Sequence, residues 1–167
     1  KGGVPRGGRI YSTGVGQQDH TIGWGHALTV AEKKAAGLSS GGGKNDSLSN
    51  APFATIYGIK VTYHPDWEGI SNSEAQTILE GDWKKFTRLV NKEGFALTQY
   101  EFDSLVHFIY NVGSVPSSIR LLINDGEYDK VPAKMMEYNC AGGRCGNRGL
   151  INRRSREILV WNGEYPN

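Results

Sequence analysis

Residues 97–113 read LTQYEFDSLVHFIYNVG and carry the clearest structural signal in the chain. Thr98 and Glu101 have the spacing of a capping box, in which the threonine oxygen accepts a backbone hydrogen bond and the glutamate reaches back to the cap residue. Apolar residues then recur every three or four positions, on most sides of the predicted helix. Gly113 is a typical stop signal. The stretch therefore predicts a helix at the buried centre of a helical lobe.

Further helices are predicted on both sides of this segment. Ser71 and Glu74 repeat the capping-box spacing, and the apolar residues that follow step by three and four as far as Val90. Shorter periodic stretches indicate three more helices, which are expected at about 117–124, 131–138 and 150–161.

The N-terminal part of the chain has a different pattern. Residues 9–25 are rich in glycine and β-forming residues and predict a β-hairpin or small sheet. A loop and insertion are expected over 36–69, with one strand from Ala54 to Val61. The predicted fold class is α+β: a small N-terminal β-hairpin lobe packed against a larger helical lobe, with a ligand-binding cleft between them. We expect residues 1–167 to form a single domain.

Composition narrows the class of protein. The 167 residues are 38% hydrophobic and 22% charged, which is typical of a soluble globular protein. No apolar run approaches the roughly 18 residues needed to span a bilayer. The net charge of +2 and the absence of a dense basic block speak against nucleic acid as a partner. The chain opens abruptly at Lys1 without a signal peptide, which predicts a fragment whose N-terminal part precedes it.

Two features near the C-terminus leave alternatives open. Cys140 and Cys145 predict either a local disulfide or two free thiols, and the absence of a nearby histidine excludes an ordinary zinc site. Five arginines cluster in the same region and predict a solvated helix face with some ion pairs. They are Arg144, Arg148, Arg153, Arg154 and Arg156.

Three segments together resemble the phage-type lysozymes, glycoside hydrolase family 24. They are Thr21-Ile22-Gly23-Trp24-Gly25-His26, residues 97–113, and Gly149-Leu150-Ile151-Asn152-Arg153-Arg154. The resemblance implies a lysozyme-like fold and hydrolysis of the β-1,4 bond between N-acetylmuramic acid and N-acetylglucosamine in peptidoglycan. Such enzymes use one carboxylic acid to protonate the leaving oxygen and a second carboxylate to assist the attacking water.

The resemblance implies catalytic roles for two residues. Thr21 matches the family threonine and is expected to hold the attacking water. The position of the family aspartate is Thr13 here, so we assign the water-orienting carboxylate to Asp19, which would share a strand face with Thr21. The alternative for Asp19 is a turn aspartate that caps local backbone. The family glutamate has no counterpart in residues 1–10, and we expect it to precede Lys1 on a helix that this chain lacks. The alternatives are that Lys1 or a neighbour replaces the glutamate, or that the fold has lost its activity.

Other positions follow the family more closely. Tyr110 and Asn111 match a pair that binds substrate, the ring by stacking on a sugar and the amide by hydrogen bonding to an N-acetyl group or a hydroxyl. A plain core aromatic is the alternative for Tyr110. His26 and Asp82 match a structural ion pair near the cleft, which would raise the pKa of the histidine. Arg153 and Arg154 are expected to hold the last helix to the catalytic lobe, with a solvated face as the alternative.

The sequence thus predicts a muramidase of the endolysin type, or a toxin domain delivered to a rival's periplasm, that acts as a monomer on the cell wall. The alternatives are an inactive peptidoglycan-binding module and a lytic transglycosylase. The resemblance implies no cofactor and no metal. If the chain is an interbacterial toxin, a cognate immunity protein that fills the cleft is expected as a partner.

Overall fold

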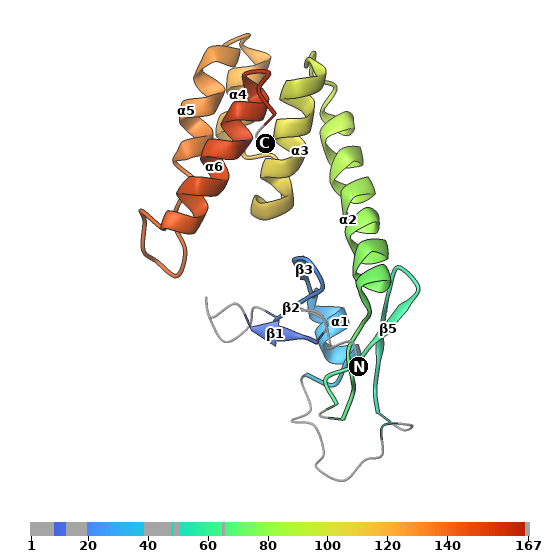
Figure 1. Cartoon of the computed structure of the whole chain (residues 1–167). Helices are drawn as coiled ribbons and strands as arrows, with labels where there is room; N and C mark the ends of the chain where they lie inside the picture. The colour runs from blue at the N-terminus through green and yellow to red at the C-terminus, as the bar shows by residue number, and fades with distance from the viewer. Residues whose placement is uncertain (1–8, 13–19, 39–47, 49–50, 65, 166–167) are drawn as a thin grey trace. The chain divides into compact units, whose positions relative to one another are not determined.

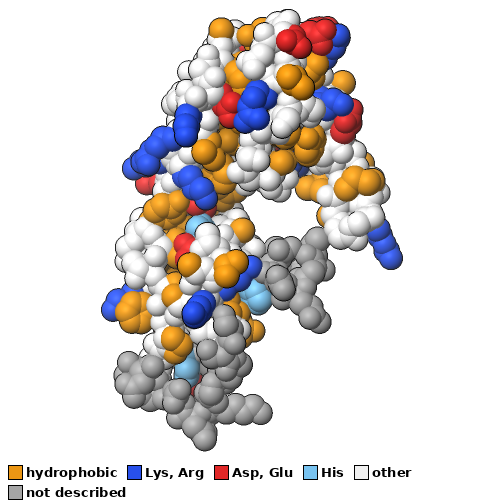
Figure 2. Space-filling view, turned by 180° about the vertical axis from the view of Figure 1, so that it is seen from behind, with side chains coloured by type: hydrophobic (Ala, Val, Ile, Leu, Met, Phe, Trp, Pro, Cys, Tyr) orange, Lys and Arg blue, Asp and Glu red, His pale blue; other side chains and the backbone are white. Residues whose placement is uncertain are grey.

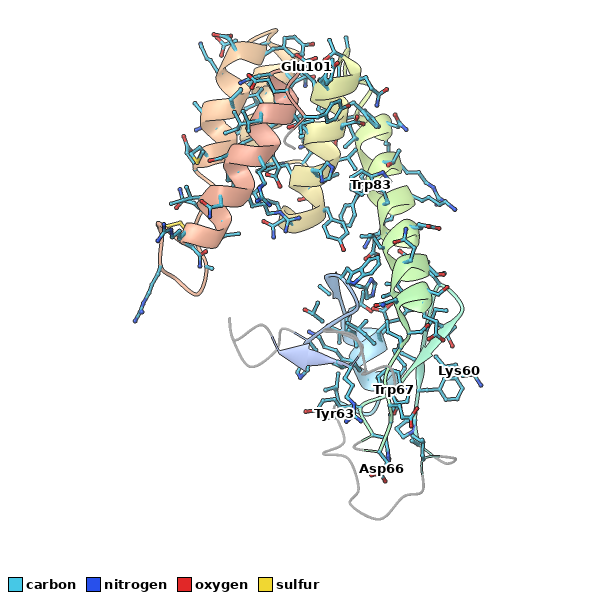
Figure 3. The ribbon with its side chains drawn as sticks, viewed as in Figure 1. Lys60, Tyr63, Asp66, Trp67, Trp83 and Glu101 are labelled. Atoms are coloured by element: carbon cyan, nitrogen blue, oxygen red, sulfur yellow. A yellow bond between two sulfur atoms is a disulfide. The ribbon has the colours of Figure 1, made fainter. Side chains whose placement is uncertain are left out.

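Helix α3 (Gln99–Val112) is the central element of the C-terminal helices (Figure 1). The computed structural model describes residues 9–12, 20–38, 48, 51–64 and 66–165. The predicted capping box is confirmed: the Glu101 amide donates to the Thr98 hydroxyl at 3.3 Å, and the Glu101 carboxylate accepts from the Thr98 amide at 2.7 Å. Figure 3 labels Glu101 in the first turn of α3. The helix ends at Gly113, whose φ of 97° is left-handed, as the stop signal predicted.

The helices around α3 bury an extended apolar cluster. They are α4 (Ser117–Asn124), the short 3₁₀ helix η2 (Tyr128–Lys130), α5 (Val131–Met136) and α6 (Arg148–Trp161). Leu105 and Phe108 of α3 are completely buried in this cluster, together with Ile119 of α4 and Met135 of α5. The prediction that α3 is the buried centre of a helical lobe is therefore confirmed. The expected helix over 131–138 is shorter and ends at Met136.

The segment between α5 and α6 is closed by a disulfide between Cys140 and Cys145. The sequence left a local disulfide and two free thiols as alternatives, and the structure contains the disulfide. Ala141 and Arg144 form a β-bridge inside the ring, and the Asn139 side chain accepts a hydrogen bond from the Gly146 amide at 2.8 Å. The disulfide and these hydrogen bonds fix the backbone just before the first turn of α6.

The N-terminal residues form a three-stranded antiparallel sheet, which confirms the predicted small sheet. Its strands are β1 (Tyr11–Ser12), β2 (His20–Ile22) and β3 (His26–Ala27), in the order β1-β2-β3. Helix α1 (Val30–Ala35) follows, and the sequence analysis missed it. Its signal was present, since Thr29 and Glu32 form the same capping box that the analysis recognised before two longer helices.

The expectation of one strand from Ala54 to Val61 is wrong. The segment is a hairpin of β4 (Ala54–Ile56) and β5 (Ile59–Val61), turned by Tyr57 and Gly58 with φ of 47° and 88°. Two consecutive residues at positive φ define a tight turn of the kind that favours a two-residue hairpin. The hairpin belongs to the core, because Ala54, Ile56 and Val61 are at most 2% exposed.

Helix α2 (Asn72–Glu93) contributes side chains to two apolar cores in the described part of the chain. Ala75 and Ile78 in its first half pack with residues of the sheets, whereas Phe86 and Val90 in its second half pack with the C-terminal helices. The chain accordingly divides into two compact units, Lys1–Asp82 and Trp83–Asn167, and the division falls within this helix. Small sheets in one unit and helices in the other confirm the α+β class.

Gly81 of α2 provides a test of how the β4–β5 turn packs. A methyl group at this position would lie 2.5 Å from two ring carbons of Tyr57. We expect Gly81→Ala to lower the free energy of unfolding by about 1–2 kcal/mol, because the overlap outweighs the better helix propensity of alanine. In a Tyr57→Asn background, where asparagine tolerates the positive φ and removes the ring, the same change should instead be stabilising by about 1 kcal/mol. Urea unfolding of the four proteins gives both values, and equal effects in the two backgrounds would contradict the packing.

Candidate functional site

Thr21 lies in the middle of β2 and is 6% exposed. Its backbone pairs with Tyr11 on one side and Ala27 on the other, so the residue is fixed by the central strand of the sheet. Asp19, which the sequence assigned as the partner carboxylate, falls outside the described residues. The shared strand face of Asp19 and Thr21 therefore stays a prediction.

The structure brings His26 and Asp82 into direct contact. His26 Nδ1 lies 2.9 Å from both carboxylate oxygens of Asp82, and the two residues are only 7% and 4% exposed. The contact links β3 to α2 across 56 positions of sequence. A buried carboxylate this close to an imidazole nitrogen is a hydrogen-bonded ion pair when the histidine is protonated.

Two residues that the sequence analysis did not select complete this cluster. The Tyr57 hydroxyl donates to Asp82 Oδ1 at 3.0 Å, and Glu32 Oε2 lies 3.4 Å from His26 Nε2. Both come from elements whose form was not predicted, the turn of the β4–β5 hairpin and α1. Their contacts with the His26–Asp82 pair depend on these two elements, so the sequence alone did not indicate them.

The surroundings of His26 raise its pKa above the ordinary value. Burial is the largest single influence and lowers the pKa, because it disfavours the imidazolium. The hydrogen bond to Asp82 and the charges of Asp82 and Glu32 act in the opposite direction and together outweigh burial. The cation is therefore the form that the folded protein stabilises.

In the C-terminal unit, Tyr110 and Asn111 lie at the end of α3. The Tyr110 ring is half-buried and packs edge-on against Phe86, with 5.5 Å between ring centroids. The guanidinium of Arg153 lies over the same ring, 5.9 Å from its centroid. Asn111 is exposed, and its Oδ1 accepts a hydrogen bond from Arg154 Nη2. Helix α6 thus contacts both residues that the resemblance assigned to substrate binding.

Arg154 is not part of a solvated face, and that interpretation of the arginine cluster is wrong for this residue. Its side chain is completely buried, with the guanidinium 4.6 Å from the Phe108 ring centroid and Nη1 3.0 Å from Glu157 Oε2. The alternative prediction, that it holds the last helix against the other helices, describes these contacts. Both basic and acidic side chains are present on the face of the molecule that Figure 2 shows.

Glu157 is the residue of this group that the sequence analysis missed. It is 5% exposed, pairs with Arg154 one turn away, and accepts from Arg153 Nε at 3.1 Å. The hydroxyl of Ser104 on α3 donates to its backbone carbonyl at 2.7 Å. Burial raises the pKa of the Glu157 carboxyl, while the charges of Arg154 and Arg153 oppose that rise. The spacing of Arg154 and Glu157, three apart on a helix, was a signal that could have found the pair.

The described residues contain no group of three histidine, cysteine or acidic side chains able to hold a metal ion. Within the same part of the chain, no helix combines the length and apolar character that a bilayer crossing requires.

Residues 8–157 match the phage lysozyme family, and the chain belongs to this family. It is similar to the endolysins of Bacillus phage B103, with 37% identity over 66% of this chain, and of Bacillus phage PZA, with 35% identity over 58% of this chain. The SAR-endolysin of Escherichia phage Mu is 28% identical over 70% of this chain and 74% of its own length.

A solved structure supports the same fold. The endolysin from Escherichia coli O157:H7 phage FAHEc1 superimposes with a TM-score of 0.55 and 26% identity, covering 84% of this chain and 96% of that structure. The matched chain spans 43% and 39% of the two Bacillus phage endolysins.

The His26–Asp82 pair predicts a specific pH dependence of stability. The pKa of His26 in the folded protein lies above the unfolded value of about 6.5. The stabilisation by the pair is therefore fully present below the unfolded pKa and is lost as the pH rises through the raised pKa of His26. Asp82→Asn should lower the free energy of unfolding by about 3 kcal/mol at the acidic end of this window and by less at alkaline pH. Urea unfolding across the pH range measures the difference between the two proteins.

Asp66→Asn is the matched control for this prediction. Asp66, labelled in Figure 3, also lies beside a histidine, His64, but its side chain is 83% exposed and 4.0 Å away. Because the Asp66 carboxylate stays in water, its interaction with His64 contributes little, and we expect a change within about 0.5 kcal/mol. A pH-independent difference for Asp82→Asn would contradict the role given to the His26–Asp82 pair.

Proposed function

We propose that the chain is a peptidoglycan hydrolase, a muramidase that cleaves the β-1,4 bond between N-acetylmuramic acid and N-acetylglucosamine. The observation that carries this proposal is the match of residues 8–157 to the phage lysozyme family. The endolysins among its relatives support it. The expected reaction is hydrolysis by general acid and base catalysis, with release of a reducing sugar end.

In this proposal, Thr21 holds the attacking water and Asp19 orients it and stabilises positive charge on the sugar. The buried, doubly paired position of Thr21 suits the first role, since a water-binding hydroxyl works best when its orientation is fixed. His26 and Asp82 have a structural role: their contact fixes β3 against α2, and β3 is the strand that pairs with Thr21. Tyr110 and Asn111 bind the glycan.

One sequence feature favours a second candidate. Residues 1–18 contain no aspartate or glutamate, so they supply no acid to protonate the leaving oxygen. A lysozyme-like module that binds peptidoglycan without cleaving it would need no such acid. Such a module would keep the glycan contacts of Tyr110 and Asn111 and produce no new sugar ends.

For partners and location, we propose bacterial peptidoglycan as the substrate, contacted by a monomer at the cell wall or in the periplasm. A phage endolysin and a secreted toxin domain are both compatible with this activity. The toxin case adds a cognate immunity protein, which a pull-down from the producing strain would identify.

The decisive experiment is digestion of purified peptidoglycan, followed by mass spectrometry of the soluble fragments. A muramidase yields muropeptides with reducing N-acetylmuramic acid ends, whereas a lytic transglycosylase yields an anhydro end that is lighter by one water. Co-sedimentation with insoluble peptidoglycan is measured in parallel. For the full-length protein, binding without new sugar ends would establish the second candidate. The absence of both binding and cleavage would refute both candidates.

Thr21→Val tests the proposed role of the threonine, because it removes the hydroxyl while keeping the shape of the side chain. We expect the rate of fragment release to fall about a hundredfold with little change in stability, since the attacking water loses its orientation. Thr55→Val, an exposed strand threonine of β4, is the matched control and should leave the rate unchanged. Equal rates for wild type and Thr21→Val would remove Thr21 from the mechanism.

A further inference from the structure

The side-chain amide of Asn111 is held in one orientation by the chemistry of its partner. A guanidinium group carries only donors, so the Asn111 atom that contacts Arg154 Nη2 must be the carbonyl oxygen Oδ1. Rotating the amide by half a turn would place an N–H group against another N–H group. Because Asn111 is otherwise exposed, Nδ2 is the group that it presents to a ligand.

Arg154 in turn has little freedom to release the amide. Its side chain is completely buried, its guanidinium lies on the Phe108 ring, and Glu157 compensates its charge at 3.0 Å. Glu157 is itself fixed by Arg153 and is 5% exposed. Moving the arginine toward solvent would leave the Glu157 carboxylate buried without its closest counter-charge, which is strongly unfavourable.

The ligand group that suits a fixed donor is a carbonyl oxygen. A sugar hydroxyl can donate or accept and would be served by either orientation of the amide, whereas an acetamido carbonyl can only accept. Tyr110 precedes Asn111 on α3, and its half-buried ring packs against Phe86 and the guanidinium of Arg153. The acetamido carbonyl of a wall sugar is therefore the ligand group that the fixed donor of Asn111 favours.

We propose that Arg154 and Glu157 are positioning residues that hold Asn111 as an obligate hydrogen-bond donor, so that the site selects the acetamido carbonyl of a wall sugar. This inference rests on the proposed function and deepens it, since it names the chemical group that is recognised. It also assigns a binding role to two buried residues that do not themselves touch the ligand.

Asn111→Asp is the direct test. Aspartate has nearly the same shape and keeps the contact with Arg154 as an ion pair, but it replaces the outward donor with an acceptor. Binding is measured by calorimetry to an uncrosslinked peptidoglycan glycan strand and to the same strand after chemical N-deacetylation. All the proteins compared carry Thr21→Val, which is expected to slow hydrolysis about a hundredfold, and the titration is completed before a measurable fraction of the strand is cleaved. We expect Asn111→Asp to fold normally and to bind the N-acetylated strand about tenfold more weakly or worse.

A second variant separates positioning from folding. Replacing both members of the buried pair, Arg154→Met with Glu157→Met, leaves no completely buried charge without a partner and is tolerated in many proteins. Arg153 loses its contact with Glu157, but its side chain is 39% exposed and its charge can be solvated. It frees the amide to rotate, so the preference for the N-acetylated over the deacetylated strand should fall several-fold while the melting temperature stays close to that of wild type. Arg156→Met removes an exposed charge from the same helix and should keep the full preference.

The outcomes separate the two levels of proposal. If the parent protein binds the N-acetylated strand and Asn111→Asp binds it equally well, the inference is wrong and the proposed function stands. If the parent binds neither strand, the proposed function fails and the inference fails with it. An unchanged preference in a folded Arg154→Met, Glu157→Met protein would show that the pair is only structural.

Discussion

The need to compensate buried charge shapes both compact units of this protein. In the N-terminal unit, the imidazole of His26 and the carboxylate of Asp82 are removed from water together, 2.9 Å apart. In the C-terminal unit, Arg154 and Glu157 are buried as a pair. Removal of one member of such a pair lowers the free energy of unfolding far more than replacement of both members by apolar residues, because the remaining charge is left buried without a partner. The His26–Asp82 pair fixes β3 against α2. Arg154 and Glu157 both lie on α6, and they hold this helix against α3 through their contacts with Asn111, Phe108 and Ser104.

How far the sequence predicted this arrangement depended on whether the signals were local. Capping boxes at Thr98 and Ser71 act within three residues, and the helices they begin were found correctly. The Tyr57–Gly58 turn was missed because its first residue is a tyrosine at positive φ, which no propensity favours. The sequence left two alternatives for Arg154, a solvated face and a contact with the other helices, because arginine side chains are usually exposed. It did not predict that the side chain is completely buried.

The candidate site shows the same division between local and non-local information. Family resemblance selected His26, Asp82, Tyr110 and Asn111, and the structure adds the groups that hold them: Tyr57 and Glu32 around the first pair, and Arg153, Arg154 and Glu157 around the second. Glu32 follows His26 closely in sequence, whereas Tyr57 and Arg154 lie 25 and 43 positions from the residues that they hold. The contacts of Tyr57 with Asp82 and of Arg154 with Asn111 were visible only in the folded chain, because periodicity and spacing carry no information on contacts across 25 or 43 positions.

Helix α2 has a consequence for any attempt to dissect the protein. Its first half contributes side chains to one apolar core and its second half to the other, so a cut at the boundary after Asp82 would split one continuous helix. Each product would then carry a frayed stub of about three turns, which is marginal in water without its continuation. Autonomous fragments would instead need the whole of Asn72–Glu93, and only one fragment of a pair can keep it. Because both units depend on the same helix, separate expression would leave one of them with an incomplete apolar core.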